Sequence, residues 1–256
     1  MATIQIADIQ NLYLPTLTFK KLIRLIFTFS RKSTPMISAK ITHSNLDLDL
    51  LFEKGVWIKE LKVLLIADLH LGKATHYRKA GIPIPETIHQ LDFLTLEKLV
   101  HRFQPLHLYF LGDLFHSHWN EQWEYFLDFI KQFPETNFHL IKGNHDILPE
   151  QNYQTSFLEI HSSPVTLGNL YLSHEPVTVP EKQLNICGHI HPGIYLKGRG
   201  KLSLRLPCYY WNNNTLVLPS FGNFTGLQLV EKKPSDRIWV IGEDRVFPLL
   251  STGSIG

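Results

Sequence analysis

The chain has 256 residues, 44% of them hydrophobic, and a formal net charge of +2. This length and composition allow a full hydrophobic core, and no Ser/Gly-rich or charged linker interrupts the chain, so one large globular domain is favoured. The near-neutral charge gives no strong case for nucleic acid as a partner. Only Cys187 and Cys208 are present, too few for a disulfide framework, which indicates a reducing, cytoplasmic compartment.

The first 35 residues differ in composition from the rest. Their net charge of +4 leaves residues 36–256 with a net charge of −2. Lys20, Lys21 and Arg24 interrupt the apolar stretch here, so it lacks the ~20 uninterrupted apolar residues of a membrane span. Basic residues inside and after the stretch also argue against a secretory signal. We expect the domain to span residues 36–256, preceded by an extension that is either upstream of a start at Met36 or an amphipathic surface helix.

Strands and helices are predicted to alternate after Met36. Short apolar runs rich in strand-forming residues predict strands, and apolar residues at intervals of three and four predict amphipathic helices. In chain order these are a strand at 62–67, a helix at 87–103, a strand at 106–111, a helix at 121–133 and a strand at 137–141. Strands joined by helices require crossover connections, so we expect a largely parallel sheet.

From residue 157 onward, short strands replace the helical period. Strands are expected at 163–167, 169–172, 202–210 and 215–218, with a hairpin tip at Asn212-Asn213-Asn214. A second sheet is therefore predicted. The expected fold class is α/β, a two-sheet sandwich flanked by helices.

Five polar runs recur in order along the chain, most of them directly after a predicted strand. They are Asp68-Leu69-His70, Gly112-Asp113, Gly143-Asn144-His145-Asp146, Ser173-His174-Glu175 and Gly188-His189-Ile190-His191. Ligands of open α/β folds bind at the carboxyl ends of strands. Alternate residues of an extended segment point to one face, so we expect Asp68 and His70, and likewise His189 and His191, to point at one region.

The residue types in these runs suit two metal ions. A carboxylate can bridge two cations through its two oxygens, and mixed His, Asp and Asn ligation favours Mn, Fe or Zn over Ca or Mg. Taken singly, Asp-x-His after a strand is commonly a capped turn, and Gly-Asp is common in turns. The run at 143–146 is more specific, because an adjacent His and Asp are costly to bury without a purpose. The ordered combination of all five indicates a metal site.

These motifs resemble the calcineurin-like metallophosphoesterase superfamily over about residues 62–192. The resemblance implies a four-layer fold and hydrolysis of phosphoesters with two divalent metal ions, taken as Mn²⁺ with Fe or Zn as alternatives. It implies one metal site formed by Asp68, His70 and His191, a second formed by Asn144, His174 and His189, and Asp113 as the bridge between them.

The same resemblance makes His145 the residue that faces the phosphate and protonates the leaving alkoxide. Many members of the superfamily support this His with a second Asp three residues after the bridging one, and here that position is His116. Asp146, which we also take as a candidate catalytic residue, or Glu175 could supply the missing carboxylate.

A second set of motifs extends the resemblance to about residue 226. Residues 67–73, Arg78, residues 81–85 and residues 218–226 are similar to the ligase-associated DNA damage response endonuclease group. This similarity implies cleavage of DNA, with DNA ligase or helicase repair proteins as partners and no membrane. It leaves the oligomeric state open.

Basic and aromatic residues near the first run are candidates for binding the substrate. Lys73, His76 and Arg78 could hold a phosphate backbone or belong to a solvated turn. Trp119 and Trp123 could stack on bases, although packing in the core is the favoured interpretation.

Three functions stay open: a DNA-processing phosphodiesterase or nuclease, a hydrolase of nucleotides or other small phosphoesters, and a non-catalytic scaffold. The filled ligand positions and the presence of His145 count against the scaffold. The near-neutral body counts against tight nonspecific DNA binding, whereas the second set of motifs favours DNA.

Overall fold

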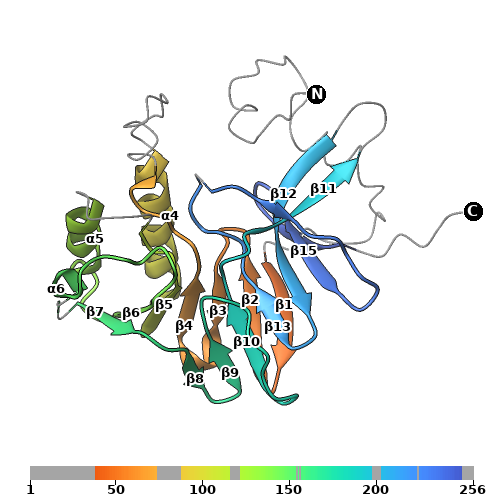
Figure 1. Ribbon diagram of the computed structural model, residues 1–256, viewed down its shortest axis with the longest axis horizontal. Coiled ribbons are helices and arrows are strands. Elements are labelled where there is room, and N and C mark those ends of the chain that lie inside the picture. The colour runs from red at the N-terminus through yellow and green to blue at the C-terminus, as the bar shows by residue number, and fades with distance from the viewer. Residues whose placement is uncertain are drawn as a thin grey trace, which may run out of the picture.

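In the computed structural model, the first sheet contains seven strands that follow chain order from β1 to β7 (Figure 1). The pairs from β1 to β4 are antiparallel, and the pairs from β4 to β7 are parallel. The strands are β1 (Ser38–His43), β2 (Leu46–Leu51), β3 (Val56–Ile58), β4 (Val63–Ile66), β5 (His107–Leu111), β6 (Asn137–Ile141) and β7 (Leu158–His161). The predicted parallel arrangement is confirmed for β4, β5 and β6.

The structure describes residues 38–73, 88–115, 122–153, 155, 157–197, 203–223 and 225–249. The expected N-terminal extension lies outside these ranges. No helix within them is both long enough and apolar enough to cross a bilayer.

Helices pack against the outer face of the parallel half of the first sheet (Figure 1). They are α4 (Ile88–Phe103), α5 (Gln122–Ile130) and the short α6 (Glu150–Tyr153), and a 3₁₀ turn, η1 (Lys59–Leu61), precedes β4. The two long helices confirm the prediction. In α5, Trp123 is 2% exposed and packs edge-on against Phe115 and Tyr153, so it belongs to the core as favoured. Trp119 lies outside the described residues.

The second sheet has the strand order β14-β11-β12-β13-β10-β9-β8, with β15 beside β12 and β16 beside β15. Its strands are β8 (Val165–Leu167), β9 (Leu170–Leu172), β10 (Leu184–Cys187), β11 (Pro192–Lys197), β12 (Ser203–Asn212), β13 (Thr215–Val217), β14 (Gln228–Leu229), β15 (Arg237–Ile241) and β16 (Val246–Pro248). The predicted hairpin is confirmed, because Asn212 pairs with Thr215 across the turn.

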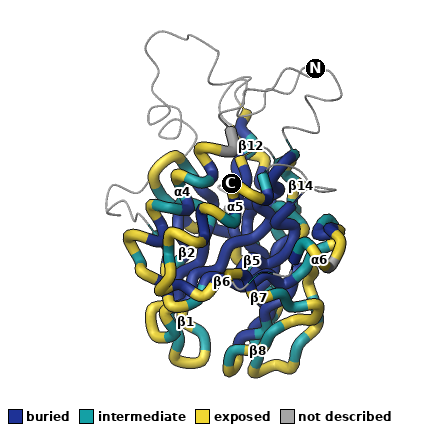
Figure 2. Tube along the Cα trace, turned by 90° about the vertical axis from the view of Figure 1, so that its left-hand side faces the viewer, coloured by how far each residue is buried: buried dark blue, intermediate teal, exposed yellow. Residues whose placement is uncertain are grey.

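Two hydrophobic clusters hold the layers together. One lies between α4, α5 and the first sheet, and the other lies between the two sheets, with residues from β1 to β6 facing β9, β10, β12, β13, β15 and β16. Figure 2 shows the buried residues concentrated in the strands and the exposed ones in the turns. The packed sheets confirm the predicted α/β sandwich and form a rigid base beneath the loops at the strand ends.

Candidate metal centre

The candidate ligands lie in loops that follow five strands of the two sheets. Asp68 and Asp113 come two residues after β4 and β5, and Asn144 comes three residues after β6. His174 and His189 come two residues after β9 and β10. The carboxyl ends of parallel strands meet at one edge of a sheet, and sheet packing brings the two sets of loops together. The predicted placement at strand ends is confirmed for Asp68, Asp113, Asn144 and His174, and the structure adds His189 after the unpredicted strand β10.

The loops after β4 and β5 remain paired beyond the strands. The amide of Asp68 donates to the backbone oxygen of Gly112 at 3.2 Å, and the amide of His70 donates to that of Asp113 at 2.9 Å. This pairing fixes the position of the first run relative to the second.

Two contacts join the second sheet to the first at this site. The amide of His189 donates to the two carboxylate oxygens of Asp68, at 3.1 and 3.0 Å. Nδ1 of His174 lies 3.0 Å from the backbone oxygen of Leu111, the last residue of β5. A carbonyl oxygen only accepts, so Nδ1 carries the proton and donates, which leaves a lone pair on Nε2 of His174. The fold thereby sets the tautomer of a candidate ligand.

Four candidate ligands form a buried group: Asp68, His70, Asp113 and His191. Nε2 of His70 lies 3.3 Å from Nε2 of His191 and 3.7 Å from Oδ2 of Asp113. Nε2 of His191 lies 3.5 Å from Oδ1 of Asp68. Both carboxylates are at most 2% exposed. Two ionised carboxylates buried together need compensating positive charge, so a cation fits this group chemically.

Asp113 also belongs to a second group, with His174 and His189. Nε2 of His174 lies 3.1 Å from Nδ1 of His189 and 3.4 Å from Oδ1 of Asp113. It also lies 2.9 Å from Oδ1 of Asn144. An amide oxygen and a carboxylate cannot donate to that lone pair, whereas a shared cation satisfies every acceptor. The structure thus brings all seven predicted ligands together in two groups that share Asp113.

The backbone at these residues is not extended as expected. φ is positive at Asp68 (54°), His70 (51°), Asp113 (48°), His189 (69°) and His191 (50°). The left-handed region is uncommon for residues other than Gly, although Asp, Asn and His adopt it more readily than most, and it costs roughly 1 kcal/mol or more per residue. Alternation along an extended strand is therefore the wrong explanation. The pairs converge because alternate residues adopt left-handed turns.

Gly143 and Gly188 directly precede candidate ligands, and each lets a carboxylate from another loop approach the backbone closely. A Cβ on Gly143 would overlap the carboxylate of Asp113, and a Cβ on Gly188 would overlap the carboxylate of Asp68. Each glycine therefore leaves space for a carboxylate that comes from another loop.

His145 lies beside the shared carboxylate. Its backbone amide donates to Oδ1 of Asp113 at 2.9 Å, and its ring centroid is 5.5 Å from that of His70. His145 is half-buried, and Asn144 and His189 are exposed. The centre therefore opens to solvent on the side formed by these three residues.

Asp146 is buried beneath this loop. Its Oδ1 accepts from the amide of Phe115 at 3.0 Å, and its Oδ2 accepts from the amide of Gly143 at 2.9 Å. Burial raises the pKa of Asp146 to about 6 although these two hydrogen bonds act to lower it. Asp146 therefore holds the turn that carries His145 through these two hydrogen bonds.

Lys73 is the one predicted substrate-binding residue within the described ranges. Burial lowers the pKa of its ammonium group, and the carboxylates of Asp113 and Asp68 act in the opposite direction. Lys73 is thus close enough to the centre to interact with both acids. His76, Arg78 and His116 lie outside the described residues.

A segment within the 218–226 motif lies behind the first run, and we call it the strap (residues 219–223). Ser220 Oγ donates to the backbone oxygen of Asp68 at 2.7 Å, and the amide of Phe221 donates to that of Ala67 at 2.8 Å. A Cβ on Gly222 would overlap the backbone of Leu69. The strap therefore supports the Asp68 loop through backbone contacts.

A polar network around the buried carboxylate of Asp92 anchors the strap to α4. The amide and Nδ2 of Asn223 both donate to Oδ1 of Asp92, at 3.1 and 2.7 Å, and Lys54 Nζ donates to Oδ1 of Asn223 at 3.2 Å. Asp92 is 2% exposed, whereas Leu91 is 52% exposed. The helix thus turns a carboxylate inward where the apolar pattern predicted a leucine. In the sequence, Asp92 lies four residues before Leu96 and seven before Leu99, a helical spacing that places it on the same core-facing side as these two leucines.

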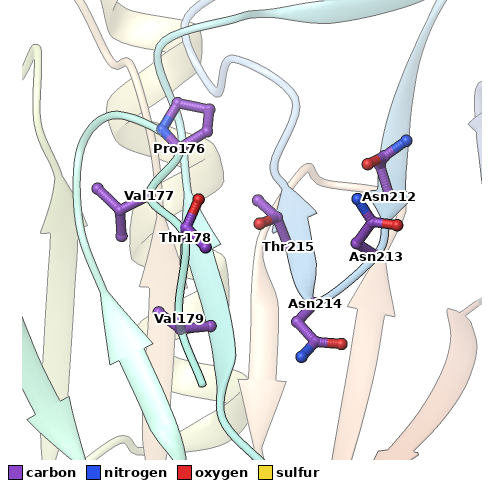
Figure 3. A pocket seen from close by; sticks show the side chains of 8 residues that line it. All are labelled: Pro176, Val177, Thr178, Val179, Asn212, Asn213, Asn214 and Thr215. Atoms are coloured by element: carbon purple, nitrogen blue, oxygen red, sulfur yellow. The ribbon is translucent and has the colours of Figure 1, made fainter. Parts of the chain in front are cut away.

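A hollow of about 340 Å³ lies on the second sheet, away from these groups. Figure 3 shows the residues that line it, at 176–179 and 212–215. None of them is a candidate ligand. The candidate metal ligands therefore lie at the strand ends and not in this hollow.

Among the solved structures similar to this chain is the nuclease MPE of Pseudomonas putida. It is 27% identical, with a TM-score of 0.69, and the match covers 83% of this chain and all of that one. The phosphoesterase Yfce of E. coli matches at 14% identity and a TM-score of 0.38, over 71% of this chain and 88% of its own. Vps29 of Entamoeba histolytica matches at 13% identity and a TM-score of 0.34, over 73% and 96%.

Comparison with curated proteins finds no match. The family model for calcineurin-like phosphoesterases matches residues 61–242, which is more than half of the chain and contains both ligand groups and the strap. The family predicted from the motifs is therefore confirmed. This chain belongs to the calcineurin-like phosphoesterases and is a metal-dependent phosphoesterase.

Proposed function

We propose that this chain is a dinuclear phosphodiesterase that cleaves DNA. The observation that carries the proposal is the position of Asp113. Its Oδ2 faces His70 of one group, its Oδ1 faces His174 of the other, and the same Oδ1 accepts from the amide of His145. One carboxylate thus connects two metal-binding groups to a candidate proton donor.

Two divalent ions would be held by the two groups. We assign Asp68, His70 and His191 to one ion, Asn144, His174 and His189 to the other, and Asp113 to both. When bound, such a pair polarises a phosphoryl group and provides a nucleophile from water near neutral pH. We propose Mn²⁺, with Fe and Zn as alternatives, because mixed imidazole, carboxylate and amide ligands suit these metals.

The chain's own residues supply the remaining chemistry. His145 stands half-buried at the solvent side of the centre, where an imidazolium can protonate the leaving alkoxide of a phosphodiester. Asp146 holds the turn of His145, and the ammonium group of Lys73 binds a phosphate oxygen of the substrate. His76 and Arg78 follow Lys73 in the chain, and we keep them as candidate phosphate contacts.

The choice of DNA is supported by two similarities. The nuclease MPE matches over its whole length, and residues 67–73 and 218–226 carry the motifs of the ligase-associated endonuclease group. A role in DNA repair with ligase or helicase partners is proposed on the same basis. Two buried free thiols, Cys187 and Cys208, support the proposed cytoplasmic location.

The test compares substrates on the purified protein with Mn²⁺ added: single-stranded DNA, duplex ends, cyclic nucleotides and bis-p-nitrophenyl phosphate. Asp113→Asn serves as the inactive control in every assay. We expect cleavage of DNA that weakens steeply with salt, because contacts to the phosphate backbone release counterions. Hydrolysis of the small diester or of cyclic nucleotides without any cleavage of DNA would overturn the nuclease proposal and favour a small-molecule phosphodiesterase.

A further inference from the structure

A second cluster of metal-binding residue types lies on the parallel half of the first sheet, apart from the seven ligands. His139 on β6 pairs in register with Glu159 on β7, and His161 follows two residues later on the same face. That face is turned toward the second sheet, since Tyr109, which pairs with His139, contributes to the core between the sheets. β7 is the last strand of the first sheet (Figure 1).

The donor groups of these three side chains form a small triangle, in which each of the two oxygens of Glu159 faces one imidazole. His139 Nδ1 lies 3.2 Å from His161 Nε2 and 3.2 Å from Glu159 Oε2, and His161 Nε2 lies 3.6 Å from Glu159 Oε1. Tetrahedral Zn²⁺ sites have metal–ligand distances of about 2.0–2.1 Å, which place neighbouring ligand atoms roughly 3.3–3.4 Å apart. The triangle therefore has the size of one face of a zinc tetrahedron.

The surroundings of His139 orient its ring for binding. Its Nε2 lies 2.9 Å from Nδ1 of His107, and its ring stacks on that of Tyr109 with centroids 4.2 Å apart and planes at 9°. With the proton on Nε2, His139 donates to His107, and the lone pair on Nδ1 points into the triangle.

The cluster opens toward solvent through its outer residues. The side chains of His139, His161 and Glu159 are 6%, 20% and 64% exposed, respectively. Glu159 also lines a hollow of about 230 Å³ together with Lys131 and Phe157. The exposed side chain of Glu159 therefore leaves the cluster accessible from solvent, and water can complete the coordination of an ion held by three ligands.

We propose that His139, Glu159 and His161 form a third metal site, separate from the dinuclear centre, which binds one Zn²⁺ ion and links β6 to the edge strand β7. Glu159 and His161 would each bind the ion, so two metal–ligand bonds would hold β7 in addition to its backbone hydrogen bonds. Because Zn²⁺ binds the folded chain, it should also raise the stability of the protein in proportion to its free concentration.

The test counts Zn²⁺ ions bound by the metal-stripped full-length protein, using calorimetric titration and elemental analysis after dialysis. The wild type is compared with His161→Ala, with Glu159→Gln, which preserves the shape of the side chain, and with the control His101→Ala, an exposed histidine on α4. We expect one fewer tight Zn²⁺ ion per chain in both cluster variants and no loss in the control. Phosphodiesterase activity with Mn²⁺ should stay within about twofold of the wild type.

The same comparison in a His189→Ala background separates this site from the dinuclear centre. In this background, adding His161→Ala should again remove one Zn²⁺ ion per chain. Added Zn²⁺ should raise the melting temperature of this double variant less than that of the His189→Ala single variant. Equal Zn²⁺ counts with and without the cluster substitutions would overturn the proposal and reduce the triangle to a hydrogen-bond network. If His161→Ala does not fold, Glu159→Gln alone decides.

Discussion

The backbone amide of His145 donates to Oδ1 of Asp113, so the candidate proton donor is tied to the shared carboxylate through the main chain. His145→Ala keeps this hydrogen bond and removes only the imidazole. We therefore expect the variant to bind metal like the wild type. It should lose roughly 10²–10⁴-fold in rate on alkyl phosphodiesters and much less on bis-p-nitrophenyl phosphate, whose leaving group needs no proton. Metal analysis and steady-state kinetics check both parts.

Asp113→Asn is the matched comparison, because it removes a charge shared by both groups and should cost metal and activity together. Full activity of His145→Ala on an alkyl phosphodiester would contradict the role of His145 as general acid.

A second prediction concerns the space between the loops. Gly188→Ala would place a Cβ against the carboxylate of Asp68 and push it away from His191. We expect the variant to retain less metal and to lose at least tenfold in activity, measured by elemental analysis and by hydrolysis of bis-p-nitrophenyl phosphate. Gly226→Ala is the control, because nothing lies within 4 Å of a Cβ built there. Wild-type metal content in Gly188→Ala would show that the loop relaxes without cost.

The sequence predicts β4, β5, β6 and the two long helices well, but not the parallel edge strand β7, and the reason is periodicity. The helix at 88–103 and the strands beside it have apolar patterns that differ clearly from each other. β10 was missed because the buried Asn185 interrupts its apolar run, whereas the four residues of β4 are all apolar. β14, with two residues, is too short to carry any pattern. Such strands depend on their neighbours in the sheet, which a local pattern does not contain.

The family resemblance carried by the motif runs predicted which side chains meet, but the backbone conformation that brings them together could not be predicted from the sequence. Positive φ angles at Asp68 and His70 depend on contacts with Gly112, Asp113 and the strap, which are distant in the chain. A local pattern favours an extended strand there. The inward position of Asp92 likewise depends on Asn223, 131 residues away.

A third prediction tests a contact between the two sheets. The hydroxyl of Tyr209 on β12 is fully buried and lies 2.7 Å from the backbone oxygen of Leu51 and 2.6 Å from that of Gly55. Tyr209→Phe removes the hydroxyl donor that the two carbonyls share, while each keeps a backbone donor, the amide of Lys54 for Leu51 and the amide of Leu51 for Gly55. We therefore expect a loss of about 1 kcal/mol in the free energy of unfolding, measured with urea. Tyr195→Phe on β11, where the side chain is 41% exposed, should be neutral. Equal stability of the two variants would mean that the carbonyls find other donors, and neither variant should change metal content.

The fourth prediction concerns the pH dependence of stability and rests on Asp92. Burial raises its pKa from 3.8 to about 6, opposed by the charge of Lys54 and the hydrogen bonds from Asn223. Since the pKa in the folded protein lies above its ordinary value, the folded state favours the protonated acid. The resulting stabilisation is complete below about pH 4 and is lost as the pH rises through about 6.

Asp92→Asn has the same shape and does not titrate, so it isolates this effect. The free energy of unfolding of the wild type, relative to this variant, should fall by roughly 3 kcal/mol between pH 4 and pH 7, because each unit of pKa shift corresponds to about 1.4 kcal/mol. Urea unfolding of the metal-stripped proteins measures the difference, and Asp128→Asn, with a side chain 72% exposed, controls for loss of a surface charge. A difference that does not change with pH would mean that Lys54 and Asn223 keep Asp92 ionised even at pH 4, so that a carboxylate rather than a neutral acid anchors the strap throughout this range.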